Sequence, residues 1–171
     1  MEKQDFSEII KRYQQKIYQV VFSLVRNEVD ADEIVQQTYV CAYKGLKNFR
    51  GDASIETWFI RIALNNVRSY FRKRKILSFF YDADGKTEDI EDGTQNTEKA
   101  VENEAAKKTV DRAIYKLPFR QKEVFVMKHL NGLSINQISE VLGIAEGSVK
   151  SNIFKAIKNL KKYLEDFYVV Q

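Results

Sequence analysis

The stretch from Leu133 to Lys158, "LSINQISEVLGIAEGSVKSNIFKAIK", constrains the fold more than any other part of the chain. Apolar residues recur every three or four positions on both sides of Gly143, which predicts two short amphipathic helices joined by a tight corner. With one proline and seven glycines in 171 residues, the chain has few helix breakers, so helices can extend through most of it. The sequence therefore predicts an all-α protein.

The same stretch has the pattern of a helix-turn-helix, in which the second helix enters the major groove of DNA. Ser134 is expected to cap the first helix, and Gly143 to turn the chain with a positive φ. The residues expected to share the core of this motif are Ile135, Ile138, Leu142, Val149, Ile153, Ala156 and Ile157.

The outward positions of the second helix are polar or basic. Lysines contact phosphates, and serine, asparagine and lysine also hydrogen-bond base edges. The basic cluster and the motif together favour DNA binding, and the alternative is a helical hairpin with a solvated basic face. These outward residues are Ser148, Lys150, Ser151, Asn152, Lys155 and Lys158.

Three longer helices are predicted in the first part of the chain. Helical periodicity covers about Phe6–Arg26 and Ala31–Leu46, and a third helix follows Ser54. Asp30, with Glu33 as its capping-box partner, is expected to cap the second helix, and Ser54 the third. Together these helices are expected to pack as one bundle.

The charges are segregated along the chain, although the formal net charge is only +4. Residues 61–75 hold six basic residues and no acid, and residues 82–98 hold seven acids against Lys86 alone. Residues 145–164 hold five lysines against Glu146 alone. This order suggests two cationic surfaces joined by an anionic tether.

The helical pattern stops between residues 76 and 97, where acids, glycines and threonines dominate from Asp82 onward. This segment is long for a loop within a compact domain, so it predicts a flexible acidic linker. The predicted architecture is two small helical domains, residues 1–75 and 98–171, joined by that linker.

A second basic segment, "WFIRIALNNVRSYFRKRK", begins at Trp58 and interleaves aromatic residues with arginines. Single-stranded nucleic acid suits such a helix, because bases stack on rings and cations follow the backbone. The alternative is that Trp58, Phe59 and Phe71 belong to the core and the arginines are solvated.

No enzyme signature is present in the sequence. It has no P-loop glycine pattern and no metal-ligand cluster, and His129 is the single histidine on which a catalytic triad would depend. Cys41 is the single cysteine, and no apolar run approaches the roughly 20 residues that span a bilayer. We expect no catalytic residue, no metal, no cofactor, no membrane insertion and a cytoplasmic location.

Two long segments then show a family resemblance. "DADEIVQQTYVCAYKGLKNFRGDASIETWFIRIALNN" resembles region 2, and "LPFRQKEVFVMKHLNGLSINQISEVLGIAEGSVKSNIFKAIKNL" resembles region 4, of the extracytoplasmic-function sigma factors. These are small members of the sigma-70 family of bacterial transcription initiation factors. The resemblance implies a protein that binds core RNA polymerase and directs it to promoters by reading their −10 and −35 elements.

The resemblance also implies a role for particular residues. Asp32, Gln36 and Gln37 would bind the clamp of the largest polymerase subunit, and region 4 would meet the polymerase flap. The residues implied at the melted −10 element are Phe49, Arg50, Gly51, Asp52, Ala53, Trp58, Arg61, Asn65 and Arg68. Those implied at the −35 element are Ser148, Lys150, Ser151, Asn152, Phe154 and Lys155, of which Phe154 could equally belong to the core.

Control by a separate anti-sigma factor is a further implication of the resemblance. The competing interpretation is a stand-alone helix-turn-helix regulator, which would use its N-terminal bundle for dimerisation or ligand binding. Co-purification with core polymerase distinguishes the two.

Overall fold

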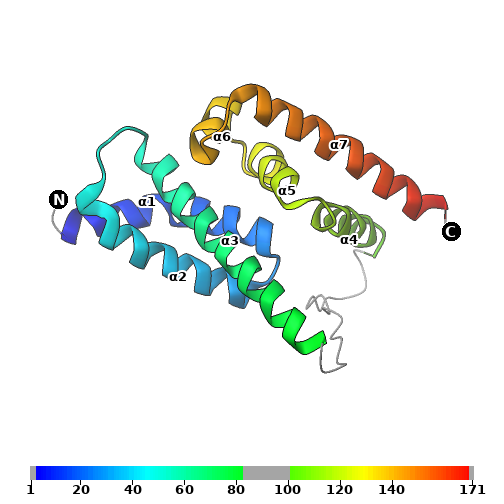
Figure 1. Ribbon diagram of the computed structural model, residues 1–171, viewed down its shortest axis with the longest axis horizontal. Helices are drawn as coiled ribbons and strands as arrows, with labels where there is room; N and C mark the ends of the chain where they lie inside the picture. The colour runs from blue at the N-terminus through cyan, green and yellow to red at the C-terminus, as the bar shows by residue number, and fades with distance from the viewer. Residues whose placement is uncertain (1–2, 83–100, 170–171) are drawn as a thin grey trace. The chain divides into compact units, whose positions relative to one another are not determined.

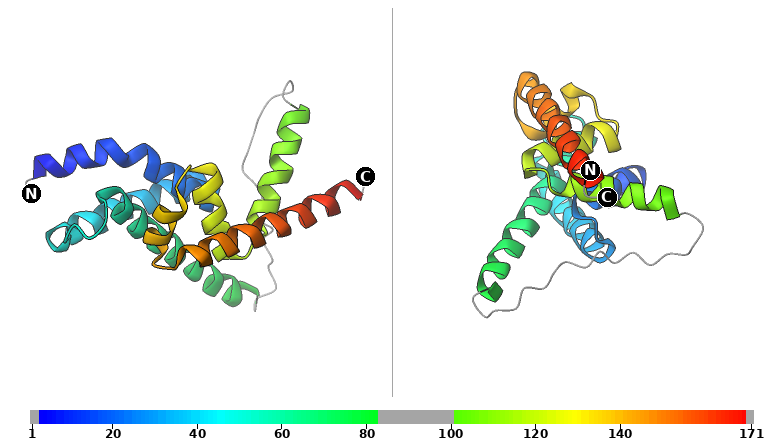
Figure 2. Two further views of the ribbon diagram at one scale, coloured as in Figure 1. Left: turned by 90° about the horizontal axis from the view of Figure 1, so that it is seen from above. Right: turned by 90° about the vertical axis from the view of Figure 1, so that its right-hand side faces the viewer.

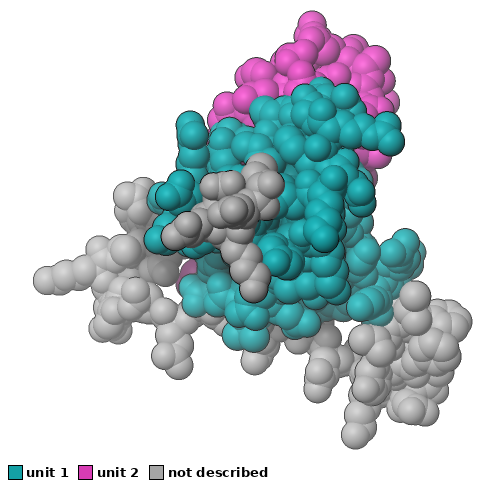
Figure 3. Space-filling view, turned by 90° about the vertical axis from the view of Figure 1, so that its left-hand side faces the viewer, with its two compact units in different colours: residues 1–93 teal, residues 94–171 magenta. Residues whose placement is uncertain are grey.

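The computed structural model describes residues 3–82 and 101–169, and every regular element in these two ranges is a helix. The chain divides into two compact units, residues 1–93 and 94–171, which are coloured separately in Figure 3. The predicted all-α fold with two helical domains is confirmed.

The first unit is a bundle of three long helices, α1 (Lys3–Val25), α2 (Glu28–Gly45) and α3 (Ile55–Asp82), which lie against one another in Figures 1 and 2. A short 3-10 turn, η1 (Leu46–Asn48), follows α2. The predicted bundle is confirmed, and each helix turns its apolar stripe inward. The apolar side chains with no exposed surface in this core are Ile17, Val20, Val21, Leu24, Ala31, Ala42, Phe59, Ala63 and Val67.

The start of α2 differs from the prediction, because Asn27 and not Asp30 is its N-cap. The Asn27 side chain accepts a hydrogen bond from the Asp30 backbone N–H at 3.0 Å. Asp30 therefore lies in the first turn, where its carboxylate accepts a hydrogen bond from the Tyr70 hydroxyl at 2.7 Å and lies 3.8 Å from Arg74. Burial and the hydrogen bond to Asp30 raise the pKa of Tyr70 to about 12.

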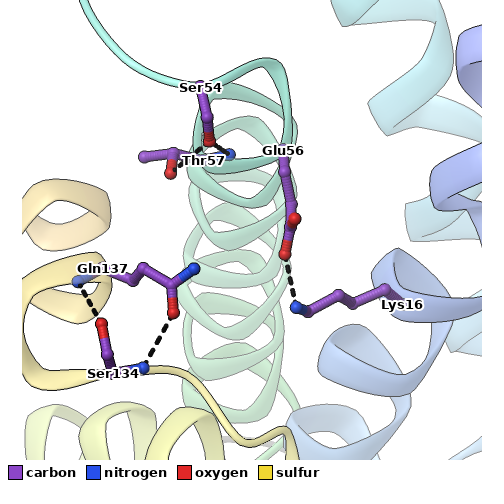
Figure 4. Close-up of polar contacts among 6 residues, drawn as sticks. All are labelled: Lys16, Ser54, Glu56, Thr57, Ser134 and Gln137. Carbon is purple, nitrogen blue, oxygen red and sulfur yellow. Dashed lines mark hydrogen bonds and ion pairs between the residues drawn. The ribbon is translucent and has the colours of Figure 1, made fainter.

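The start of α3 agrees with the prediction. The Thr57 backbone N–H donates to the Ser54 hydroxyl at 3.1 Å, so Ser54 caps the helix (Figure 4). An ion pair between Lys16 and Glu56 joins α1 to the first turn of α3. The N-terminal end of α3 is therefore fixed by its own cap and by the ion pair to α1.

The end of α3 lies beyond the predicted boundary at residue 75. The helix continues to Asp82, because "ILSFFYD" contains neither glycine nor proline to stop it. The remainder of the predicted acidic linker, residues 83–97, lies outside the described residues.

The second unit contains α4 (Val101–Tyr115), α5 (Phe119–Phe125), α6 (Ile135–Leu142) and α7 (Glu146–Val169). A π-helical turn, η2 (Val126–Leu130), extends α5. Helices α4, α5 and α6 all pack against α7, the longest helix of this unit (Figure 1). The buried apolar side chains are Ala113, Ile114, Leu117, Val124, Val126, Met127, Leu133, Ile138, Val141, Val149, Ala156 and Leu160.

Lys122 is a charged residue inside this unit. It is 5% exposed, and its ammonium lies 4.0 Å from the centroid of the Tyr115 ring. Burial lowers the pKa of Lys122 to about 8. Because the unfolded chain holds this proton up to the ordinary lysine pKa of about 10.4, it binds more protons than the folded chain between about pH 8 and 10.4. The contribution of Lys122 to the free energy of unfolding should therefore rise through that range.

We expect Lys122→Met, which keeps the apolar stem and removes the charge, to abolish this rise. The free energy of unfolding of the natural chain minus that of the variant should increase by about 1–3 kcal/mol as the pH rises from 7 to 10.4. Urea unfolding at several pH values, followed by circular dichroism, measures it. Lys161→Met, at an exposed lysine of α7, is the control and should show a constant difference. A constant difference for Lys122→Met as well would contradict the assignment.

Candidate nucleic-acid interface

The corner of the predicted helix-turn-helix is closed by local hydrogen bonds. Ser134 and Gln137 form a reciprocal capping box at the start of α6, with bonds of 3.1 and 2.9 Å (Figure 4). Gly143 has φ +64°, and its N–H donates to the carbonyl oxygen of Ser139. The Ser139 hydroxyl donates to the carbonyl oxygen of Ile144 at 2.6 Å. The predicted cap at Ser134 and turn at Gly143 are therefore confirmed.

The outward face of α7 is mostly as predicted. Ser148, Lys150, Ser151, Lys155 and Lys158 are exposed. They recur along the first four turns of the helix, where a rigid helix in a groove could present them together.

Asn152 is the exception among the predicted −35 residues. It is half-buried, and its amide nitrogen donates to the carbonyl oxygen of Ser148 at 2.8 Å. One side of the amide is therefore bonded to its own helix.

Phe154, which the sequence left between core and surface, is 71% exposed. Ile157 was predicted to be in the core and is 48% exposed, so that prediction was wrong. The buried line on α7 runs through Val149, Ala156 and Leu160, which leaves the Phe154–Ile157 edge uncovered within the described residues. Exposed apolar side chains between lysines suit contact with thymine methyl groups.

The predicted −10 residues gather on the loop between α2 and α3 and on the first half of α3. Arg50, Gly51 and Asp52 are exposed at the loop tip, and Ala53 is half-buried beside them. Gly51 has φ +78°, a conformation that side chains other than glycine rarely adopt. The loop thus presents backbone to solvent at its tip.

On α3, the residues Arg61, Asn65 and Arg68 follow one another at helical spacing. Arg61 and Asn65 are exposed, and Arg68 is half-buried. One Arg68 guanidinium N–H donates to the Asn65 side-chain oxygen at 3.3 Å. An amide and two cations therefore share one face of the helix.

The neighbouring amide, Asn66, points elsewhere. It is half-buried, and its amide nitrogen donates to the hydroxyl of Thr38 on α2 at 3.1 Å. Thr38 is fully buried and donates in turn to the carbonyl oxygen of Ile34 at 2.7 Å. Asn66 thus belongs to the contact between α2 and α3, and Asn65 to the surface.

The aromatic residues of the basic segment are divided between core and surface. Phe59 is fully buried, in accordance with the alternative that placed it in the core. Trp58 is half-buried, with its ring 5.1 Å from that of Phe49 and 5.4 Å from that of Phe59. Phe71 is half-buried against Tyr70 at 5.2 Å. None of these three rings lies wholly on the surface.

The outer face of α2 carries the predicted polymerase-binding residues Asp32, Gln36 and Gln37, and all three are exposed. Sequence reasoning missed three apolar residues on the same helix: Val29, Val40 and Tyr43, which are 77%, 45% and 48% exposed. Val29, Asp32, Gln36, Val40 and Tyr43 recur at spacings of three and four, so they form one stripe. Apolar residues at outward helical positions were the signal that would have identified them.

Comparison with known proteins identifies the family. Residues 9–77 match the family described as Sigma-70 region 2, and residues 107–160 match Sigma-70, region 4. The chain is 31% identical to the ECF RNA polymerase sigma factor SigW of Bacillus subtilis, over 94% of this chain and 89% of that protein. The chain belongs to the extracytoplasmic-function group of the sigma-70 family. Sigma factors of this family are transcription initiation factors.

Two further relatives resemble this sigma factor over most of its length. The ECF RNA polymerase sigma-E factor of Escherichia coli is 31% identical over 88% of this chain and 82% of that protein. A solved structure of CnrH in complex with the cytosolic domain of CnrY is 25% identical, with a TM-score of 0.70 over 96% of this chain and 90% of that chain.

The family matches enclose the surfaces described above. The region 2 match of this sigma factor contains the α2 stripe, the loop tip and the exposed amide and arginines of α3. The region 4 match contains α5, α6 and the exposed face of α7. No helix in the described part of this sigma factor is long and apolar enough to cross a membrane.

Proposed function

We propose that this sigma factor binds core RNA polymerase through the outer stripe of α2 and directs it to promoters. In this proposal the loop tip and α3 read the −10 element as a melted single strand, and α7 reads the −35 element as a duplex. Polymerase binding and −10 recognition belong to residues 1–75, and −35 recognition belongs to residues 98–171. Residues 76–97 join the two domains.

The observation that carries the proposal is that one chain presents two separate cationic surfaces of different geometry. Region 4 offers a rigid helix behind a closed helix-turn-helix corner, which suits a duplex groove. Region 2 offers an exposed amide between arginines beside a glycine-turned loop, which suits unpaired bases. A stand-alone regulator has no use for the second surface.

In this proposal, the protein contributes binding energy and no catalytic chemistry of its own, because polymerase performs the reaction. It works in the cytoplasm, where polymerase and DNA are. A protein partner that covers the α2 stripe or the α7 face would hold it inactive. The solved relative CnrH is bound to the cytosolic domain of CnrY, and an anti-sigma factor is the partner class we propose here.

Run-off transcription tests the proposal. Core polymerase with the purified protein should yield discrete transcripts from a pool of genomic fragments, and core polymerase alone should not. Binding to DNA fragments without any association with core polymerase, and without transcripts, would instead favour the stand-alone regulator.

The α7 surface yields a prediction about salt. Lys150→Ala together with Lys155→Ala should weaken binding to a −35 duplex and shallow the slope of log affinity against log salt by about 1.8, or about 0.9 for each phosphate that the variant no longer neutralises. Fluorescence anisotropy of holoenzyme on duplex DNA at several salt concentrations measures both quantities. Lys11→Ala with Arg12→Ala, at exposed basic residues of α1, is the charge-matched control. Unchanged affinity and slope for the α7 pair would exclude this surface.

A further inference from the structure

Gly45 lies where α2 ends and the promoter-reading loop begins. Its backbone, at φ −81° and ψ −14°, is ordinary right-handed helix, so the conformation does not require glycine. The space beside it is tight: a Cβ atom built on Gly45 would lie 3.3 Å from Cζ2 and 3.9 Å from Cη2 of the Trp58 indole. The absence of a side chain lets the indole lie against the end of α2.

Trp58 also touches the middle of the same loop. Its ring centroid is 5.1 Å from that of Phe49, the residue that follows the 3-10 turn η1. Behind it, Trp58 meets the fully buried Phe59 edge-on at 5.4 Å, so the indole rests on the core of the bundle. Trp58 thus contacts the last residue of α2 and, in the loop, the residue immediately before the exposed Arg50.

We infer that Gly45, Phe49 and Trp58 form an aromatic clasp that sets the position of the loop tip relative to the Asn65 face of α3. The clasp residues position the reading groups, and Phe49 and Trp58 act through the loop rather than by stacking on bases. Between α2 and α3 the regular structure is the short turn η1, so contacts of the loop with Trp58 are needed to fix the positions of Arg50 and Asp52. This inference rests on the proposed function of that loop.

Gly45→Ala separates positioning from stability. Alanine favours the helical backbone of position 45 more than glycine does, so α2 should be as stable or more stable. The added methyl must push the indole by a few tenths of an ångström, because a contact of 3.3 Å is tighter than nine in ten real Cβ contacts. Gly45→Leu enlarges the push with another good helix former.

The assay uses holoenzyme assembled from the full chain and core polymerase, with single-stranded oligonucleotides that carry each base at each position of the −10 element mapped by run-off transcription. The natural chain should discriminate among the bases. We expect the discrimination to fall about threefold in Gly45→Ala and about tenfold in Gly45→Leu, because small misplacements of binding groups have large effects. Core binding and thermal melting temperature should be kept in Gly45→Ala.

Two controls accompany these variants. Gly147→Ala adds a methyl to a glycine of α7 that has nothing within 4 Å of its built Cβ, and should leave −10 discrimination unchanged. Trp58 is the single tryptophan of the chain, so its emission reports the clasp directly and should shift in free Gly45→Ala but not in Gly147→Ala. Trp58→Phe removes the part of the indole that the Gly45→Ala methyl would push. In a Trp58→Phe background, Gly45→Ala should therefore have no further effect on base discrimination.

The outcomes separate the inference from the proposal beneath it. If the natural chain itself shows no base preference on these oligonucleotides, the proposed −10 role fails and the clasp fails with it. If the natural chain discriminates and both Gly45 variants discriminate equally well, only the clasp is overturned. A loss of discrimination in Gly45→Ala that matches a loss of melting temperature would also overturn it, since the residue would then be merely structural.

Discussion

Replacing Asn65 by alanine is expected to remove base preference at one position of the −10 element and to reduce promoter-directed transcription by about 10-fold or more. A melted base is recognised when it leaves the stack and its edge is hydrogen-bonded. The exposed amide of Asn65, beside Arg68 at 3.3 Å, is the group on this face that can both donate to and accept from a base edge. A good two-bond contact of this kind contributes about 1–3 kcal/mol of discrimination.

The matched control is Asn66→Ala, one residue along the same helix. Asn66 donates to buried Thr38, so its removal should lower the melting temperature and cost about 1 kcal/mol of stability, with base preference intact. The two variants should therefore have opposite effects. Asn65→Ala should change base preference without changing the melting temperature, and Asn66→Ala should lower the melting temperature without changing base preference. Oligonucleotide binding and thermal melting of the same preparations measure both. Destabilisation of Asn65→Ala with preserved preference would exclude a base-reading role.

The second large effect is expected on the outer stripe of α2. Changing Gln36 to alanine and Val40 to aspartate should weaken binding to core polymerase by about 30-fold or more, equivalent to ~2 kcal/mol, because a charge would enter a contact from which water is excluded. Both residues are exposed, so folding of the bundle should be unaffected. The milder Asp32→Ala with Gln36→Ala should show a smaller loss in the same direction.

Titration of labelled core polymerase with each variant measures the affinity, and circular dichroism checks the fold. Gln14→Asp places the same charge on an exposed position of α1 and serves as the control. Loss of helical signal together with loss of binding would mean that the α2 faces had been assigned the wrong way round. Unchanged affinity with an intact fold would place the polymerase contact elsewhere.

Features that depend on neighbours in the chain could be predicted from the sequence. The caps at Ser54 and Ser134 are bonds to residues three positions away, and the turn at Gly143 depends on one residue without a side chain. The outward phase of Lys150 on α7 follows from the helical repeat alone. The all-α fold and the exposed basic face of α7 were therefore predictable, because their causes lie within one or two helical turns.

Features that depend on residues far apart were decided by the tertiary structure. Asp30 became the partner of Tyr70, forty residues away, and left the cap to Asn27. Asn65 and Asn66 have the same chemistry, and only the packing of α3 on α2 sends one to the surface and the other to Thr38, 28 residues earlier.

The same distinction applies to single side chains that the periodic pattern misplaced or could not place. Ile157 fits an apolar stripe by its spacing, yet it is 48% exposed, while Ala156 and Leu160 on the same helix are buried. Gly45 falls at the end of a predicted helix, and nothing in its neighbours along the chain indicates that the indole of Trp58 lies against it. Helical phase, charge order and the caps at Ser54 and Ser134 are properties of the chain read along its length, so the sequence by itself determined them. Which outward or inward position finds a partner depends on surfaces brought together from distant parts of the chain, and only the packed structure decides that.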